Sequence, residues 1–175
     1  MIVLVCGLPG TGKTSTSIEL AKLANWLALS SDKIRKELIP NPTYSVEEKR
    51  LIYDVLVLIA KYLHQSGTNC ILDATCNTKY SRKEIKSKLN LSSKQIYIVE
   101  CICPEDIAIA RIKSRINDYS DANAYVYRSM KATYQPIEEE HIVVDTSKES
   151  PSINAAKIIN HISRMDIESS EKLNV

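Results

Sequence analysis

Short apolar runs alternate along this chain with longer segments in which apolar residues recur at helical spacing. A short apolar run bounded by polar residues is typical of a buried strand, and the longer period is typical of a helix that packs one face on the core. Their alternation from end to end favours a mainly parallel sheet covered by helices on both faces. The predicted fold class is therefore α/β, with strands at 2–6, 26–30, 69–73, 95–101 and 141–145.

Helices are expected between these strands, and the first spans 15–24. A second begins at Ser45, where Glu48 three residues later forms a capping box, and it ends before Gly67. A third begins at Pro104, because proline is favoured in the first turn of a helix. The apolar stripe of this third helix consists of Ile109, Ile112 and Ile116.

The first predicted strand leads directly into a segment with the GxxxxGK[ST] spacing of a phosphate-binding P-loop. Its glycines permit backbone torsions that bulkier residues resist, so that successive N–H groups can surround the phosphates of a nucleotide. Lys13 is expected to reach the β- and γ-phosphates and Thr14 to hold Mg²⁺, and the following helix presents its positive end. The expected nucleotide-binding residues here are Gly7, Pro9, Gly10, Thr11, Gly12, Lys13, Thr14 and Ser15.

Polar residues with catalytic potential follow the second strand. In an open parallel sheet the ligand binds beyond the carboxyl ends of the strands, where Ser30 and Ser31 precede Asp32 and Arg35. Asp32 and Arg35 lie three residues apart and therefore on one face of a short helix. We expect Asp32 to accept the proton of an attacking hydroxyl group and Arg35 to bind the acceptor. An ordinary surface ion pair between the two is the alternative.

The third strand ends at Asp73, followed by Ala74 and Thr75. A carboxylate in this place can hold Mg²⁺ or, together with Thr75, orient the acceptor. Strongly hydrolytic P-loop ATPases commonly have a glutamate directly after this aspartate to activate water. This chain has Ala74 instead, which favours an alcohol acceptor over water. The alternative is that Asp73 caps the helix that follows.

Arg111 and Arg115 lie four residues apart on the helix from Pro104 and are expected to point the same way. Such a pair would neutralise charge on the transferring phosphoryl group and the leaving diphosphate, with Arg115 catalytic and Arg111 binding the nucleotide. A solvated basic face is the alternative. The polar segment 117–124 predicts a lid within approximately 111–134 that closes over ATP. Thr146, after the last strand, is positioned to contact the base, and the missing guanine-reading motif favours ATP.

Length and composition favour a single domain spanning 1–175. No apolar stretch approaches the ~20 residues that a membrane span needs, and a secretory signal is missing, so we expect a cytoplasmic protein without membrane contact. Five cysteines, an odd number, argue against a disulfide framework and a disulfide-linked partner. Cys101 and Cys103 are interpreted as buried thiols rather than metal ligands, because a second ligand pair is missing.

The charge is unevenly distributed, although the net charge of +2 does not by itself indicate a nucleic-acid partner. Basic residues gather at 77–94, and acidic residues predominate from 136 onward. The basic segment includes Arg82, Lys83, Lys86 and Lys88 and is a candidate surface for a nucleic-acid backbone. A solvated helix face is the alternative.

Taken together, the motifs resemble those of the polynucleotide-kinase-like P-loop kinases. The resemblance rests on the P-loop at 7–14, SSDxxR at 30–35, DAT at 73–75, Arg111 and Arg115 on the helix from Pro104, Ser120-Asp121-Ala122, and the strand end at 144–147. It implies a three-layer α/β/α P-loop NTPase fold with a small helical lid and a five-stranded parallel sheet in the order 2-3-1-4-5. It also implies that Lys13 and Thr14 bind ATP and Mg²⁺, that Asp32 is the general base, and that Arg35 contacts the acceptor.

One departure concerns the acceptor side, where Cys76 and Lys79 stand in place of the Asn and Arg of many members. The predicted function is transfer of the γ-phosphoryl group of ATP to a hydroxyl acceptor, first of all the 5′-OH of a polynucleotide, so that nucleic acid is a candidate partner. A kinase of nucleosides, sugars or similar alcohols is the alternative. A nucleotide-binding regulatory module with little catalysis is an alternative of another class.

Overall fold

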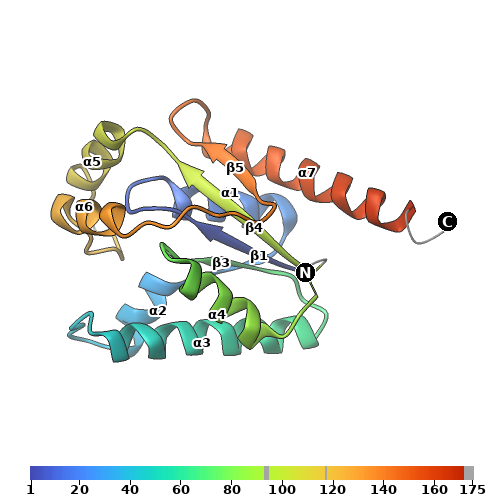
Figure 1. Cartoon of the computed structure of the whole chain (residues 1–175), viewed down its shortest axis with the longest axis horizontal. Helices are drawn as coiled ribbons and strands as arrows, with labels where there is room; N and C mark the ends of the chain where they lie inside the picture. Colours follow the sequence, from blue (N-terminus) through green and yellow to red (C-terminus); the bar gives the residue numbers. More distant parts are fainter. Residues whose placement is uncertain (93–94, 117, 172–175) are drawn as a thin grey trace.

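The computed structural model describes residues 1–92, 95–116 and 118–171, and the side chains as far as residue 165. The end of the predicted basic segment, 93–94, and the first residue of the predicted polar lid segment, 117, lie outside these described residues. The strands form one parallel sheet in the order β2-β3-β1-β4-β5 (Figure 1). This order confirms the predicted sheet.

Every strand lies within one residue of its predicted bounds. The strands are β1 (Ile2–Cys6), β2 (Leu27–Ser30), β3 (Cys70–Asp73), β4 (Ile96–Ile102) and β5 (Ile142–Asp145). The helices are α1 (Lys13–Ala24), α2 (Ser31–Leu38), α3 (Val46–Gln65), α4 (Lys79–Leu89), α5 (Glu105–Lys113), α6 (Ala124–Ala132) and α7 (Pro151–Glu171). Among the described residues, no helix combines the length and the apolar character needed to cross a membrane.

The central strand β1 is buried on both faces, as expected for a parallel strand covered by helices. Ile2 and Leu4 pack in one cluster with residues of α3 and α4, whereas Val3 and Val5 pack in another with residues of α1 and α7. Helices α3 and α4 therefore form one outer layer, and α1 and α7 form the other (Figure 1). The three-layer α/β/α architecture is confirmed.

Strand register brings three strand ends to one edge of the sheet. Val5 of β1 pairs with Asp73 of β3, and Ser30 of β2 pairs with the same Asp73. Because the strands are parallel, the P-loop, the start of α2 and the segment after β3 all leave the sheet on one side. The fold thus places the predicted catalytic segments next to one another.

The helix start at Ser45 is confirmed, but only half of the expected capping box forms. The Ser45 hydroxyl accepts a hydrogen bond from the Glu48 N–H at 3.1 Å. The Glu48 carboxylate, in turn, accepts hydrogen bonds from the N–H groups of Thr43 and Tyr44, at 2.6 and 3.1 Å, and from the Thr43 hydroxyl at 2.8 Å. Glu48 therefore fixes the turn before α3.

Helix α5 is shorter than predicted, ending at Lys113 with Ser114 as its C-terminal cap. The expected common helical face for Arg111 and Arg115 is therefore wrong, because Arg115 follows the helix. Ile116, predicted in the apolar stripe, is 86% exposed. No glycine or proline marks this helix end in the sequence, and the apolar period continues past it.

Helix α4 forms most of the predicted basic segment, and several of its charged side chains are engaged within the protein. Arg82 is 3% exposed and donates to the backbone carbonyls of Cys76, Gln135 and Pro136 at 2.9, 2.8 and 3.0 Å. Neither a nucleic-acid surface nor a solvated face describes Arg82, which holds the 135–136 segment against the domain. Ion pairs join Lys79 to Glu138, Lys86 to Glu139, and Lys88 to Asp54 and Glu84.

Two glycines with nearly equal backbone torsions differ in their surroundings. Gly10 in the P-loop has φ of +79°, and Gly67 after α3 has φ of +78°. A Cβ atom added at Gly10 would lie 2.4 Å from the backbone oxygen of Ala108, whereas one added at Gly67 would have no atom within 4 Å. Alanine substitutions at Gly10 and Gly67 therefore separate the free-energy cost of a positive φ from the cost of close packing.

We predict that Gly67→Ala lowers the free energy of unfolding by about 1 kcal/mol, the cost of a left-handed backbone for an L-residue. Gly10→Ala should lose about 1–3 kcal/mol more, because α5 must move away from the P-loop. Urea unfolding of both variants measures the difference. Equal losses would show that the P-loop accommodates the added methyl group freely.

Candidate active site

The P-loop is fixed to its neighbours by backbone hydrogen bonds. The Gly7 N–H donates to the Thr75 carbonyl at 3.3 Å, and the Thr11 hydroxyl donates to the Leu8 carbonyl at 2.8 Å. The Lys13 ammonium group also donates to the Leu8 carbonyl, at 2.9 Å. The side chain of Lys13 therefore lies along the P-loop, where it is predicted to bind phosphates.

Thr146 and Arg111 connect the P-loop to β5 and α5 through hydrogen bonds. The Thr146 hydroxyl donates to the Thr11 carbonyl at 2.9 Å, and Thr146 is 8% exposed. Arg111 donates to the Thr146 hydroxyl and to its carbonyl, both at 2.8 Å. Thr146, which we expected at the nucleotide base, is thus a buried link between α5 and the P-loop.

Thr14 and Asp73 form the pair expected to hold Mg²⁺. The Thr14 hydroxyl donates to a carboxylate oxygen of Asp73 at 2.6 Å. Burial raises the pKa of Asp73 above its ordinary value, although the charge of Lys13 and the bond from Thr14 act in the opposite direction. The cap of α4 is Thr78, so the alternative interpretation of Asp73 as a helix cap is wrong.

This donor set fits a magnesium ion held partly by nucleotide phosphates. Mg²⁺ in kinase sites is bound by one or two protein oxygens, by substrate phosphates and by water. The Thr14 hydroxyl and the Asp73 carboxylate supply two such oxygens at the start of α1. Accordingly, the described residues contain no group of three or more His, Cys, Asp and Glu side chains that could hold a metal by themselves.

Asp32 and Arg35 both lie on α2, as predicted, and they form an ion pair, which was part of the alternative interpretation, but this pair is not an exposed surface pair. Arg35 donates to Asp32 at 3.0 Å, and its Nε lies 3.0 Å from the Glu48 carboxylate. The guanidinium group also lies over the Tyr44 ring, 4.9 Å from the centroid. Arg35 is 7% exposed, and the surface alternative is therefore wrong.

Glu48 takes part in this network as an ionised group. Burial raises the pKa of the Glu48 carboxyl, but the hydrogen bonds from Thr43 and Tyr44 and the charge of Arg35 outweigh it. The pKa of Glu48 consequently lies below its ordinary value. Two carboxylates, Asp32 and Glu48, thus balance the single buried charge of Arg35.

Residues 118–121, which follow α5 in the chain, contact both Arg115 and α2. Arg115 pairs with Asp118 at 3.1 Å, and Lys36 of α2 pairs with Asp121 at 2.6 Å. The Tyr44 hydroxyl also donates to Asp121, which helps to lower the pKa of that carboxyl together with Lys36. These contacts connect the predicted lid segment to the acceptor side of the site.

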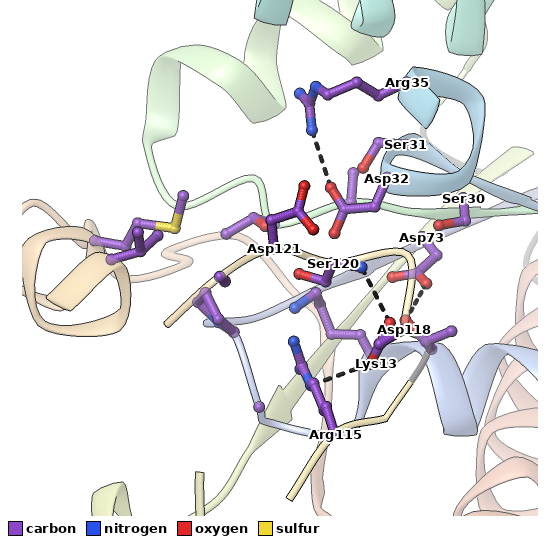
Figure 2. A pocket seen from close by; sticks show the side chains of 18 of the residues that line it. Lys13, Ser30, Ser31, Asp32, Arg35, Asp73, Arg115, Asp118, Ser120 and Asp121 are labelled. Atoms are coloured by element: carbon purple, nitrogen blue, oxygen red, sulfur yellow. Dashed lines mark hydrogen bonds and ion pairs between the residues drawn. The ribbon is translucent and has the colours of Figure 1, made fainter. Parts of the chain in front are cut away.

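A cavity of about 560 Å³ unites these segments. Figure 2 shows Asp32 joined to Arg35, and Lys13, Asp73 and Arg115 along the same cavity. Gly7, Thr11 and Thr146 do not line it. The predicted site residues that line it are Pro9, Gly10, Gly12, Lys13, Thr14, Ser15, Asp32, Arg35, Asp73, Thr75, Arg111 and Arg115.

The Arg115 guanidinium group pairs with Asp118 through Nε, but one of its other nitrogens has no hydrogen-bond partner in the part of the chain that the structure describes. The Nη1 atom of Arg115 is buried and makes no hydrogen bond with any described residue. An unsatisfied guanidinium N–H group is costly unless an anion binds it. With the P-loop amides and Lys13 lining the same cavity, this atom fits a site for nucleotide phosphates.

Sequence reasoning missed several residues of the site, chiefly Tyr44, Glu48 and Lys36. Glu48 was identified only as a capping residue, because its ion pair with Arg35 joins two different helices. Tyr44 and Lys36 act through Asp121, which is 77 and 85 residues away along the chain. No local pattern could have signalled these long-range partners.

The five cysteines have free thiols, and four of them are buried. Cys101 is buried in the sheet, and burial raises its pKa to about 12. Cys103 is partly exposed, and its Sγ lies 3.9 Å from the Gly10 carbonyl. The prediction of a buried thiol is confirmed for Cys101, whereas Cys103 is only partly buried.

The sheet order, the P-loop and the cavity beyond the strand ends define the P-loop kinase fold. Residues 2–137 match a family model described as an AAA domain, and the chain belongs to this family. Membership of this family does not by itself identify a polynucleotide kinase.

A probable adenylyl-sulfate kinase of Pyrococcus abyssi (strain GE5 / Orsay) is 26% identical over 169 residues, covering 90% of this chain and 91% of that protein. The 6-phosphofructo-2-kinase/fructose-2,6-bisphosphatase 1 of Rattus norvegicus is 28% identical over 167 residues, covering 79% of this chain but only 36% of that protein. The crystal structure of a gluconokinase from Sinorhizobium meliloti 1021 has a TM-score of 0.72 at 12% identity, covering 97% of this chain and 95% of that one. This structural likeness concerns the fold.

We predict that Glu48→Gln destabilises the protein at neutral pH and that this loss shrinks in acid. Because the pKa of Glu48 is lowered on folding, its ionised form contributes stability above the ordinary value of 4.5, and that contribution is lost as the pH falls through the lowered pKa. Thermal unfolding of wild type and variant from pH 7 to pH 3 measures the trend. Glu47→Gln, at the exposed neighbouring position, is the control. A loss independent of pH would contradict the ionic role.

Proposed function

We propose that this protein is an ATP-dependent kinase that transfers the γ-phosphoryl group to a hydroxyl group of a small molecule. The observation that carries the proposal is the position of the Asp32 carboxylate, which lines the same cavity as Lys13 and Thr14. Phosphoryl transfer needs a base near the phosphate-binding groups, and little covalent chemistry beyond that. Asp32 is the candidate base.

In this proposal the residues of the cavity divide the work. The P-loop amides, Lys13, Thr14 and Asp73 would hold Mg·ATP. When bound, Mg·ATP would supply the phosphoryl group, and its metal ion would neutralise part of the charge that develops on that group. Asp32 accepts the proton of the acceptor hydroxyl, and Arg35 keeps the carboxylate in place. Arg115 stabilises negative charge on the transferring group through its unpaired Nη1 atom. The 118–122 segment excludes water.

Two observations favour a small acceptor over the polynucleotide that we predicted first. Of the four basic side chains predicted to follow a nucleic-acid backbone, three are engaged within the protein, Lys86 and Lys88 with carboxylates and Arg82 with carbonyls, and only Lys83 has no such contact among the described residues. The 118–122 segment is held over the acceptor side by Lys36 and Tyr44. The relatives' names, adenylyl-sulfate kinase and 6-phosphofructo-2-kinase, also point to small acceptors.

We predict that Asp32→Asn lowers the rate of phosphoryl transfer by about 10²–10⁴-fold, the usual contribution of a general base, and leaves ATP affinity nearly unchanged. Lys13→Ala should weaken ATP binding as well as transfer. Single-turnover transfer and ATP titration measure the two effects. Asp106→Asn, in the first turn of α5 and outside the cavity, is the matched control. Transfer by Asp32→Asn at the wild-type rate would exclude Asp32 as the base.

We further predict that γ-labelled ATP offered with pools of sugars, nucleosides, amino alcohols and oligonucleotides labels a small-molecule pool. An oligonucleotide with a free 5′-OH and its 5′-phosphorylated twin should give equal, background signals. Labelling of the 5′-OH oligonucleotide alone would restore the polynucleotide assignment. ATP binding without transfer to any pool would favour the regulatory module.

A further inference from the structure

The cationic side chains that line the cavity differ in whether they already have a hydrogen-bond or ion-pair partner within the protein. The cavity has five of them, Lys13, Arg35, Lys49, Arg111 and Arg115. Lys13 lies against the Leu8 carbonyl in the P-loop, and the three arginines bind Asp32 and Glu48, Thr146, and Asp118, respectively. Lys49 makes no side-chain hydrogen bond or ion pair with any residue in the described part of the chain.

Lys49 is placed to act inside the cavity. It is half-buried in the first turns of α3, and its Nζ lies 6.0 Å from the centroid of the Tyr53 ring, another cavity residue. A cation–π contact at this distance is weak. A half-buried ammonium group without a counter-ion would therefore bind an anion that enters the cavity.

Arg35 does not compete with Lys49 for such an anion. Two carboxylates, Asp32 and Glu48, pair with its guanidinium group, and Tyr44 covers its face. An anionic ligand there would have to displace one of these partners. Arg35, which we expected to bind the acceptor, is thus already engaged by side chains of the protein.

The remaining groups at this end of the cavity suit hydroxyl groups. The hydroxyls of Ser31 and Ser120 line the cavity and have no hydrogen-bond partner among the described residues. Asp32 and Asp121 supply acceptors beside them. The acceptor that matches this set is a polyol with several hydroxyl groups and one anionic group.

Building on the proposed kinase function, we propose that Lys49 is a specificity-determining residue that binds a carboxylate or phosphate carried by a small polyol acceptor. The Lys49 contact holds one end of the acceptor while a hydroxyl group at the other end meets Asp32. Lys49 takes no part in proton transfer. Its loss should therefore affect acceptor binding and spare the chemical step.

Matched acceptors test this assignment, namely a set of hexoses, their aldonates and their 6-phosphates. Wild type should prefer an anionic member over its neutral parent, and the aldonate and phosphate arms identify which anion is used. Lys49→Gln should raise KM for the preferred anionic acceptor by about 10–100-fold, as expected for a lost charge-assisted contact, with kcat and KM for ATP nearly unchanged. Lys49→Arg should restore much of the affinity. Lys61→Gln, on the exposed surface of α3, is the control.

A binding measurement keeps the result independent of catalysis. Isothermal titration of wild type and Lys49→Gln with the same compounds should give tighter binding of an anionic member to wild type only, even where no transfer is detected. Since both proteins contain the same P-loop, the difference isolates Lys49. Equal affinities of the two proteins, or equal use of neutral and anionic acceptors by wild type, would overturn the assignment. Absence of transfer together with a Lys49-dependent difference would refute the kinase function alone.

Discussion

The parallel register of β1 with β3 fixes the geometry on which the candidate site depends. Val5 pairs with Asp73, so the last residue of β3 lies beside the strand that leads into the P-loop, and Thr14 can then donate to its carboxylate. The side chains of a strand alternate between the two faces of a sheet, and a slip of one residue would turn Asp73 away. The two apolar clusters that bury β1 therefore also determine where the predicted magnesium ligands meet.

Arg35 organises the other half of the cavity in a comparable way. Its planar guanidinium group meets Asp32 of α2 and Glu48 of α3 at once, which a lysine could not do with the same geometry. Removing one partner of a buried ion pair is costly because the remaining charge stays buried. The orientation of Asp32 is thus tied to the packing of α2 on α3, and Tyr44 extends this connection to Asp121 of the predicted lid segment.

The sequence predicted what local chemistry determines and missed what distant partners determine. The strand bounds and the position of Asp32 and Arg35 on one short helix follow from patterns within a few residues, and they are confirmed. The end of α5 carries no glycine or proline, so Arg115 was placed on a helix that stops at Lys113. The burial of Arg82 depends on the 135–136 carbonyls, more than 50 residues further along the chain. Such contacts exist only after the sheet has assembled.

In this fold the residues that select the acceptor must lie outside the P-loop. P-loop amides bind phosphates whatever the acceptor, and one fold supports many acceptors through changes in the surrounding residues. Here the acceptor side contains the carboxylates of Asp32, Asp118 and Asp121. Each of these carboxylates is already paired with a cation of the protein, namely Arg35, Arg115 and Lys36, whereas a neutral ligand would leave the charge of Lys49 without a partner. The electrostatic balance therefore favours an acceptor with one anionic group at the α3 side of the cavity and hydroxyl groups toward Asp32.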